Sequence, residues 1–434
     1  MNATQLQNKL ESKTATIGVV GLGYVGLPLA VEKAKAGFKV IGFDVQSEKV
    51  DKVNAGENYI GDVLPADLEK LVKAGQLKAT SNYEFIKDVD AIAICVPTPL
   101  DIYKQPNMSY VKSSAEAIAA NVTKGTLVVL ESTTYPGTTE ELIKPILEEK
   151  GFVVGEDLFL AYSPERVDPG NKDFNTKNTP KVVGGVTSAC TKVAAAMYRA
   201  VLEGDVHEVS SPAVAEMEKL LENTFRNINI GLANEMAILC NKMGIDVWEV
   251  IDAAATKPYG FMPFYPGPGL GGHCIPIDPW YLTWKAREYN YHTKLIETAG
   301  EINDSMPDFV IQRCMEILNE EGKALKGSKI VVVGVAYKKD IDDYRESPVL
   351  PILDRLTQFG ADWVVVDSYI ESFKLYNEFI NTEELNEELV DSADLILITT
   401  NHTNINYDYI INSEKLVLDT RNTGLDFKSN YFKL

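Results

Sequence analysis

The feature that most constrains the fold is a Gly-x-Gly-x-x-Gly run at residues 21–26. It follows directly on the apolar, strand-like segment 16–20, and an apolar helical pattern continues from it through Lys35. Glycines at this spacing allow a tight turn, a close approach of phosphate to the backbone, and close packing of the helix on the strand. The run therefore predicts a strand–turn–helix unit of an α/β domain, with a turn able to bind a pyrophosphate.

An acidic residue follows at a suitable distance. Residues 39–44 predict a second strand ending in Asp44, roughly twenty residues after the glycines. A carboxylate there can accept hydrogen bonds from ribose hydroxyls and would repel a 2′-phosphate, so NAD is favoured over NADP. A glycine-rich turn in an unrelated α/β fold is the alternative. The candidate cofactor-binding residues of this segment are Gly21, Gly23, Tyr24, Val25, Gly26 and Asp44.

Three regions follow one another along the chain. Strand-like segments alternate with helical ones near the N-terminus, and a second such alternation begins at Lys329. Between them, apolar residues recur every three or four positions from Pro212 to Met243, which predicts one long helix. We expect an α/β protein with two Rossmann-like parallel-sheet domains joined by a central helical domain. The expected boundaries are 1–210, 211–320 and 321–434.

Composition excludes several classes of protein. The chain has 62 acidic and 42 basic residues among its 434, a net charge of −20, which argues against non-specific nucleic-acid binding. No apolar run approaches the roughly twenty residues of a membrane span, and the polar residues 1–13 do not resemble a secretory signal. We therefore expect a cytoplasmic protein. Its five cysteines are scattered without a C-x-x-C pair, so neither disulfides nor a metal site are expected.

Several polar residues lie where predicted strands end, at the edge of a parallel sheet that binds ligands. Pro97 and Thr98 follow one strand, and Thr133 follows the next. The threonine hydroxyls can hold a nicotinamide, order a water or cap helices, and the sequence does not choose between these roles. Glu165 follows the apolar segment 158–161 and is either functional or a solvated surface charge.

Two residues of the long helix and one cysteine complete the candidates. Lys219 and Asn223 are four positions apart and share a helix face, although a helical lysine usually extends its amine to solvent. Cys274 lies in a turn rich in glycine and proline, residues 267–279, where a thiol is sterically open. We call this segment the thiol turn. Buried structural cysteines normally lie in apolar periodic segments, as Cys240 does, so we interpret Cys274 as reactive.

Taken together, these segments resemble the UDP-glucose/GDP-mannose dehydrogenase family along essentially the whole chain. The resemblance is carried by motifs in the family's order, at 21–26, 95–99, 132–137, 163–166, 219–234, 271–278 and 336–348. It implies an NAD-binding domain, a central helix that forms a homodimer, and a C-terminal domain that binds the UDP-sugar substrate. It also implies a four-electron oxidation of a sugar hydroxyl, with two NAD used in turn.

The resemblance also assigns roles. Cys274 is expected to be the nucleophile, Lys219 and Asn223 to stabilise oxyanions at C6 of the sugar, and Glu165 to activate water for thioester hydrolysis. Thr133 and Asp278 are expected to order that water or its surroundings. The expected substrate-binding residues are Glu165, Arg166, Lys219, Asn223, Gly271, Lys338 and Arg345.

The choice of sugar depends on the thiol turn. UDP-glucose enzymes of the family usually have Ser before the cysteine and Lys three residues after it, where this chain has His273 and Ile277. The turn resembles the branch that acts on UDP-N-acetylhexosamines, and residues 163–171 favour oxidation of UDP-N-acetylglucosamine for surface polysaccharides. The galacto and manno epimers and UDP-glucose are alternatives. A one-step dehydrogenase and a non-enzymatic NAD sensor are remoter ones.

Overall fold

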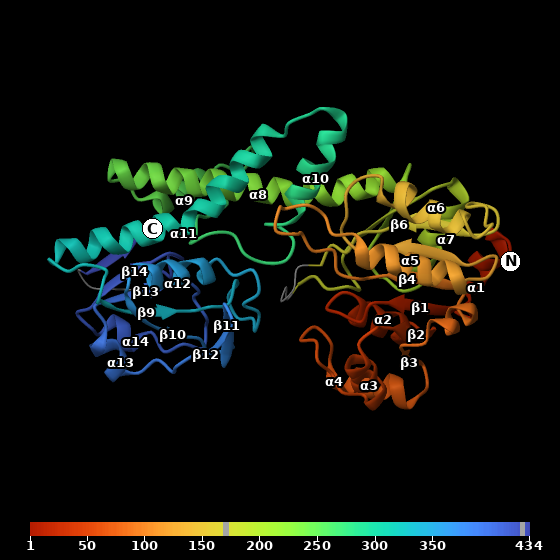
Figure 1. Cartoon of the computed structure of the whole chain (residues 1–434), viewed down its shortest axis with the longest axis horizontal. Helices are drawn as coiled ribbons and strands as arrows, with labels where there is room; N and C mark the ends of the chain where they lie inside the picture. The colour runs from red at the N-terminus through yellow and green to blue at the C-terminus, as the bar shows by residue number, and fades with distance from the viewer. Residues whose placement is uncertain (168–172, 426–429) are drawn as a thin grey trace. The chain divides into compact units, whose positions relative to one another are not determined.

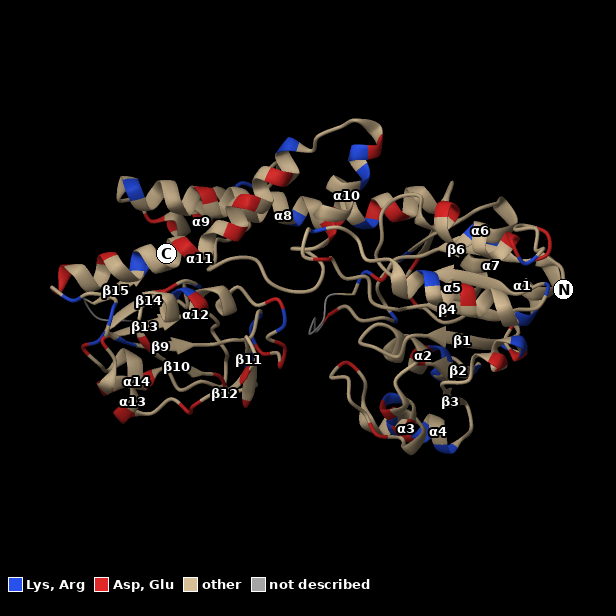
Figure 2. Ribbon diagram, in the orientation of Figure 1, with Lys and Arg blue, Asp and Glu red and all other residues tan. Residues whose placement is uncertain are grey.

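A computed structural model describes residues 1–167, 173–425 and 430–434. The chain divides into two compact units, which we describe separately: residues 1–222 with 280–290, and residues 223–279 with 291–434. Among the described helices, none combines the length and apolar character needed to span a bilayer. Figure 2 shows Lys and Arg interspersed with Asp and Glu along the described helices of both units.

The first unit contains a sheet of eight described strands in the order β3-β2-β1-β4-β5-β6-β7-β8. Figure 1 labels β1, β2, β3, β4 and β6 of this sheet. The strands of the sheet are β1 Thr16–Val20, β2 Lys39–Phe43, β3 Leu77–Thr80, β4 Ala91–Ile94, β5 Leu127–Leu130, β6 Phe159–Tyr162, β7 Lys181–Gly185 and β8 Val206–Val209. The order of the first six is that of dinucleotide-binding folds, and they pair in parallel. Strand β7 is antiparallel to β6, which places its first residues at the edge where β6 ends.

Helices cover this sheet because its strands are apolar on both faces, as in parallel sheets generally. Helix α2 packs on β1 and β2, and α7 packs on β6 and β7. The helices of the unit are α1 Ala3–Glu11, α2 Gly26–Lys35, α3 Ser47–Ala55, α4 Pro65–Lys73, α5 Ser109–Asn121, α6 Lys144–Glu148 and α7 Ser188–Arg199, with short 3-10 and π turns at Tyr83–Asp88 and Thr139–Ile143.

The second unit contains a parallel sheet of five described strands in the order β10-β9-β13-β14-β15. Its strands are β9 Lys329–Val333, β10 Asp362–Val366, β13 Leu395–Ile398, β14 Leu416–Asp419 and β15 Tyr431–Lys433, beside a hairpin of β11 Ser372–Leu375 and β12 Glu378–Asn381. The helices that pack around it are α11 Lys294–Glu320, α12 Val349–Gln358, α13 Glu387–Ser392 and α14 Asp408–Ile411. The predicted α/β class with two Rossmann-like parallel sheets is confirmed; the described antiparallel strand pairs are β6 with β7 and the separate hairpin of β11 with β12.

The long helix is also confirmed. Helix α8 runs from Pro212 to Met243, the range that the apolar spacing predicts, and it crosses the boundary between the two units (Figure 1). Helix α9, Val247–Ala255, follows it, and α10, Asp278–Ala286, begins within the last two residues of the segment 267–279 that contains Cys274. Thus the described candidate residues divide between a dinucleotide-type sheet and a unit that contains the thiol.

Candidate active site

The glycine-rich turn follows β1 and leads into α2. Gly21 has a φ of 91°, and a Cβ there would lie 2.8 Å from the carbonyl oxygen of Cys95. A Cβ on Gly26 would lie 1.8 Å from the carbonyl oxygen of Gly21. At Gly23, by contrast, a Cβ would meet no described atom within 4 Å. Packing explains the first and third glycines, whereas the second leaves open the space that a pyrophosphate would approach.

Asp44 follows β2 and is nearly buried, at 6 % exposed. Its Oδ2 accepts the backbone N–H of Leu22 at 2.9 Å, and its Oδ1 accepts that of Gln46 at 2.9 Å. Tyr59 donates its hydroxyl to the carbonyl of Leu22 at 2.7 Å. The carboxylate is thus fixed beside the glycine turn, and each oxygen retains acceptor capacity for a ribose hydroxyl. These residues fit the adenosine half of NAD.

The hydroxyl-rich turns after β4 and β5 are hydrogen-bonded to each other. Thr98 donates its side-chain hydroxyl to the carbonyl of Thr133 at 2.7 Å, and Ser132 donates to the carbonyl of Val96 at 2.7 Å. Tyr281 donates to the carbonyl of Thr98. The hydroxyls of Thr98 and Ser132 therefore cross-link two turns, and the turn after β4 adjoins the point between β1 and β4 where the strand order reverses. Pro97 is exposed and the Thr133 side chain is half-buried.

Glu165 lies after β6 with its side chain 18 % exposed, so it is not a freely solvated surface charge. Its neighbour Arg166 donates to Glu222 of α8 and, at 3.0 Å, to the carbonyl of Pro180. The guanidinium predicted to bind substrate thus anchors its own loop to the first turns of the long helix. Of the predicted specificity segment 163–171, residues 168–171 lie outside the described part of the chain.

Lys219 is buried, at 6 % exposed, and does not extend to solvent as an isolated helical lysine would. Asn223, one helical turn later, is also buried and belongs to the second unit. Its amide donates to Asp278 Oδ2 at 2.5 Å. The amide and the carboxylate, both predicted site residues, are therefore in direct contact.

The thiol turn is compact. The carbonyl of Cys274 accepts the N–H groups of Ile277 at 3.0 Å and of Asp278 at 2.8 Å, which closes the turn at the start of α10. Cys274 is partly exposed, whereas the other four cysteines, Cys95, Cys190, Cys240 and Cys314, are buried. The predicted contrast between one accessible thiol and four core thiols is present in the structure.

Two asparagines that we did not predict as individual site residues hold this turn. Asn227 donates to the carbonyl of Ile275 at 3.2 Å, and the side-chain oxygen of Asn234 accepts the N–H of Gly267 at 3.0 Å. Both are buried, and they follow Asn223 by four and eleven residues, so the three share a helix face. Buried amides repeated at helical spacing are a sequence signal that could have identified them.

The thiol turn also packs on the segment 336–348 of the second unit. A Cβ on Gly271 would lie 2.7 Å from the Cβ of Tyr337, so glycine is required by this close approach. His273 Nε2 lies 2.8 Å from Asp343 Oδ2. Arg345 also binds Asp343, with Nε 2.9 Å from Oδ1 and Nη2 2.8 Å from Oδ2. Lys338 is half-buried, whereas Arg345 is exposed. His273, whose role the sequence left open, thus links the thiol turn to the basic segment.

The hydrogen bonds that Asp343 accepts from Arg345 and His273 affect its pKa. Burial alone would raise the pKa of Asp343, but the hydrogen bonds from Arg345 and His273 outweigh burial and hold this pKa well below its ordinary value. The carboxylate is therefore ionised at neutral pH and can keep both partners in place.

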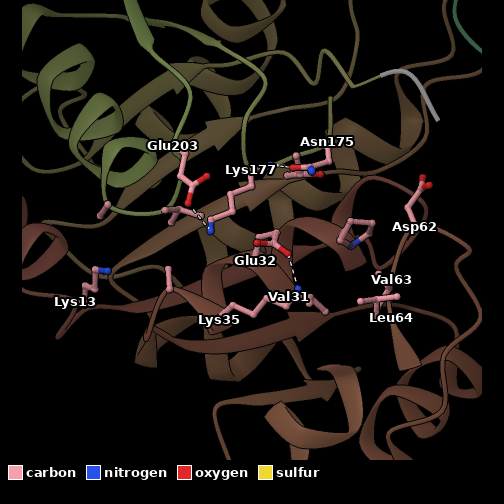
Figure 3. Close-up of a pocket in the computed structure, with 15 residues that line it drawn as sticks. Lys13, Val31, Glu32, Lys35, Asp62, Val63, Leu64, Asn175, Lys177 and Glu203 are labelled. Atoms are coloured by element: carbon pink, nitrogen blue, oxygen red, sulfur yellow. Dashed lines mark hydrogen bonds and ion pairs between the residues drawn. The ribbon is translucent and has the colours of Figure 1, made fainter. Parts of the chain in front are cut away.

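A separate hollow of about 600 Å³ lies in the first unit beside α2 (Figure 3). It contains none of the predicted site residues. Of its cations, Lys35 pairs with Glu32 at 2.9 Å, and Lys177 pairs with Glu203 at 2.6 Å. Two of the three lysines that line the hollow are therefore paired with carboxylates, and the third is Lys13.

Comparison with known proteins identifies all three parts of the chain. Residues 15–202 match the NAD binding domain of the UDP-glucose/GDP-mannose dehydrogenase family. Residues 213–305 match the family's central domain, and residues 331–424 match its UDP binding domain. NAD is therefore the cofactor, in agreement with the prediction from Asp44 and the glycine turn.

Individual relatives share this organisation. A UDP-N-acetyl-D-glucosamine 6-dehydrogenase of Pseudomonas aeruginosa is 37 % identical over 85 % of this chain and 86 % of its own length. A UDP-N-acetyl-D-mannosamine dehydrogenase of Campylobacter jejuni is 38 % identical over 88 % and 94 %. The solved structure of a UDP-D-ManNAc dehydrogenase from Pyrococcus horikoshii superposes with a TM-score of 0.88 at 33 % identity, covering 96 % of this chain and 98 % of that one. With its glycine turn, its accessible thiol and all three domain matches, the chain belongs to the UDP-glucose/GDP-mannose dehydrogenase family.

Proposed function

We propose that this protein oxidises the C6 hydroxyl of UDP-N-acetylglucosamine to the carboxylate, through a thioester on Cys274. The observation that carries the proposal is the partly exposed thiol on a turn fixed by Asn227 and His273, while the other four cysteines are core residues. A buried structural cysteine needs no such presentation. The working division of the chain is 1–210 for NAD, 211–320 for the dimer and thiol, and 321–434 for the UDP-sugar.

The reaction runs in three steps. C6 loses a hydride and its hydroxyl group loses a proton, which gives an aldehyde, and the Cys274 thiolate adds to the aldehyde carbon. The resulting thiohemiacetal loses a second hydride and becomes a thioester, which water hydrolyses to the carboxylate and the free thiol. NAD, when bound, supplies the hydride acceptor for both oxidations. Covalent capture divides a difficult oxidation into easier steps and keeps the aldehyde from escaping.

The chain's own residues stabilise the charges that develop. Lys219 and Asn223 interact with the oxyanion at C6, since a cation and an amide donor directed at a developing negative charge lower the barrier. Glu165 accepts a proton from the attacking water, and Thr133 and Asp278 order its surroundings. Glu165, Arg166, Gly271, Lys338 and Arg345 contribute to holding the substrate.

We choose UDP-N-acetylglucosamine over its epimers because of the sequence of the turn around Cys274 and of the segment 163–171. The relatives do not decide the question, because glucosamine and mannosamine enzymes are 37 % and 38 % identical to this chain. The manno and galacto epimers and UDP-glucose are therefore the alternatives. The product would serve surface polysaccharide synthesis, and the reaction would take place in the cytoplasm.

The deciding experiment measures NADH formed from limiting amounts of each of the four UDP-sugars. We expect about two NADH per UDP-N-acetylglucosamine and little from the others, as two oxidations through one covalent intermediate require. Two NADH from another sugar would keep the mechanism and replace the substrate. One NADH per sugar, or full turnover by a Cys274→Ala variant, would instead indicate a one-step dehydrogenase. NAD binding without any NADH formation would indicate a non-enzymatic NAD sensor.

We also propose a homodimer formed through α8. In the second unit, Phe225, Leu232, Leu239 and Met243 of this helix are exposed at intervals of seven, seven and four residues. Tyr259, Phe261 and Met262 of the following segment are exposed as well. A face of large apolar side chains is typical of a surface that a partner covers. Light scattering should give the mass of two chains, and a Leu232→Arg variant should lower it to one.

A further inference from the structure

A buried cluster of charges lies in the first unit, at the edge of the sheet where β5 and β6 end. Glu131 is the first residue after β5, and Glu165 follows the last residue of β6, Tyr162, by three positions. Because β7 is antiparallel to β6, it begins at this same edge, and its first residue is Lys181. The reversed direction of β7 therefore delivers a lysine to two carboxylates.

The lysine bridges the two acids. Lys181 Nζ lies 2.7 Å from Glu131 Oε2 and 3.3 Å from Glu165 Oε2. Glu131 accepts a further hydrogen bond at its other oxygen, from the hydroxyl of Tyr198 at 2.5 Å. The side chains of Lys181 and Glu131 are 5 % and 0 % exposed. Glu131 and Tyr198 thus form a buried support that fixes the position of the ammonium group.

The Glu165 carboxylate is held at both oxygens. Its Oε1 accepts the N–H groups of Arg166 at 2.8 Å and of Val167 at 2.9 Å, and its Oε2 faces Lys181. Burial alone would raise the pKa of Glu165, but the charge of Lys181 and then the two amides outweigh burial and lower it. The acid is therefore a carboxylate at neutral pH, in one orientation.

Burial of this ion pair is weak evidence for a stabilising role. Taking a lysine and a glutamate out of water costs several kcal/mol per ion, and replacing a buried pair by apolar residues is often neutral or stabilising. Lys181 also contacts a second carboxylate, that of Glu165, which is partly exposed at the carboxyl edge of the sheet. This argues that the pair acts on Glu165 rather than on the fold.

We infer that Lys181, supported by Glu131 and Tyr198, is a positioning residue that orients Glu165 as the base for thioester hydrolysis. The inference rests on the function proposed above. In this step the water oxygen bonds to C6, one water proton passes to Glu165, and the C6–S bond breaks to release the Cys274 thiolate. Lys181 exchanges no proton and forms no bond; it holds the acceptor oxygen.

Other groups face the same cluster. Lys33 of α2, with its side chain fully buried, lies with Nζ 4.9 Å from the ring centre of Tyr198 and has no hydrogen-bond partner among the described residues. Burial lowers the pKa of Lys33. Cys95 after β4 is also within electrostatic range of Glu165, and burial raises its pKa. Lys33 contacts neither carboxylate by hydrogen bond, so it provides a matched control: a second buried cation that does not hold Glu165.

The test is a Lys181→Met variant of the whole enzyme, studied with NAD and UDP-N-acetylglucosamine. We expect a burst of two NADH per active site at the wild-type rate, followed by turnover about 10- to 100-fold slower at pH 7, as loss of an oriented base predicts. Acid quenching and mass spectrometry should find the thioester on Cys274. Without the nearby cation, the pKa of Glu165 should rise, so the acid limb of the pH profile, where turnover falls as the pH is lowered, should move to a pH about 1 to 3 units higher.

Controls separate positioning from folding. Lys181→Arg keeps the charge and should restore most of the turnover, and Lys33→Met should leave the acid limb closer to that of the wild type. If Lys181→Met does not fold, the double variant Glu131→Leu/Lys181→Met replaces the ion pair by apolar residues and should show the same burst and the same limb. A folded variant with a wild-type acid limb and no accumulated thioester overturns the inference. A wild-type enzyme that forms one NADH per sugar overturns the proposed function itself.

Discussion

The two parallel sheets use the same structural element for different purposes. In the first unit, Asp44 follows β2 and accepts the N–H of Leu22 from the turn after β1. In the second unit, Asp367 follows β10 and accepts the N–H groups of Val335 and Ala336 from the turn after β9. An acid after the second strand thus supports the turn after the first strand in both sheets.

The difference lies in what else each acid contacts. Asp367 and His402 are both fully buried, and His402 Nε2 lies 3.1 Å from Asp367 Oδ2. The other ring nitrogen, Nδ1, accepts the N–H of Asp340 at 2.9 Å, so Nε2 carries the proton that Asp367 accepts. Asp44 lies instead beside Gly23, where the turn is open. We therefore propose that a similar position in the topology provides a ligand group in the first sheet, whereas it holds a structural group in the second.

The largest effect that would sharpen this contrast is on stability. Asp367 Oδ1 accepts the N–H groups of Tyr369 and Ile370, while Oδ2 accepts those of Val335 and Ala336. Asparagine has one acceptor oxygen, so its amide group in Asp367→Asn opposes the two backbone donors at Oδ1 in one orientation, and the two backbone donors and His402 at Oδ2 in the other. We expect the free energy of unfolding to fall by about 3 kcal/mol, measured by denaturant titration.

Asp44→Asn is the matched control for that measurement. It opposes a single backbone donor, since each Asp44 oxygen accepts one N–H from Leu22 or Gln46. Its cost should be about 1 kcal/mol. Equal losses of stability for the two variants would contradict the distinction between a structural and a ligand-binding acid.

The local parts of this comparison were predictable from the sequence. The strand 16–20, the turn 21–26 and the helix 212–243 depend on residues close in the chain, and the structure places β1 and α8 within those bounds. Periodicity and glycine spacing act over a few residues, so the sequence reports them directly.

The remaining features depend on long-range pairing. His402 is 35 residues from Asp367, and Lys181 is 50 residues from Glu131. Neither residue belongs to a local motif, and nothing near Lys181 in sequence indicates that β7 runs antiparallel to β6. For the same reason the contact of His273 with Asp343, 70 residues away, could not be predicted. The accessibility of the Cys274 thiol could be predicted, because it depends on the local glycine-rich turn.

A second prediction concerns the ligand-binding side of the comparison. Replacing Asp44 by alanine removes the charged acceptor that we assign to the ribose hydroxyls. We expect kcat/KM for NAD to fall by about 10- to 100-fold, corresponding to a hydrogen bond to a charged group. The preference for NAD over NADP should also narrow, because the repulsion of the 2′-phosphate is lost. Steady-state kinetics with both cofactors measures this, and unchanged NAD kinetics would place Asp44 with Asp367 as a structural acid.

A smaller effect distinguishes the turns themselves. A Cβ at Gly23 meets no described atom, whereas a Cβ at Gly334, after β9, would lie 2.3 Å from the Cβ of Thr400. Gly23→Ala should therefore keep the free energy of unfolding within about 0.5 kcal/mol. The added methyl group would, however, occupy the approach to the pyrophosphate and raise KM for NAD by about tenfold. Gly334→Ala should do the opposite, destabilising the fold without a direct effect on NAD. Thermal unfolding and NAD titration of the two variants test this pair.

The smallest effect is on the pH dependence of stability. Burial alone would raise the pKa of Asp367, but the hydrogen bond from His402 and those from the backbone outweigh burial and lower it. A carboxyl whose folded pKa lies below its unfolded value, about 3.9, contributes stability that is fully present above that value and is lost as the pH falls through the folded pKa. Between pH 5 and pH 3, the wild type should therefore lose about 1 kcal/mol more than Asp367→Asn, which has no group to titrate there. Denaturant titrations of both proteins across this range give the difference directly, because the remaining carboxylates are common to both. Parallel pH profiles would mean that His402 and the backbone donors do not favour the ionised form of Asp367.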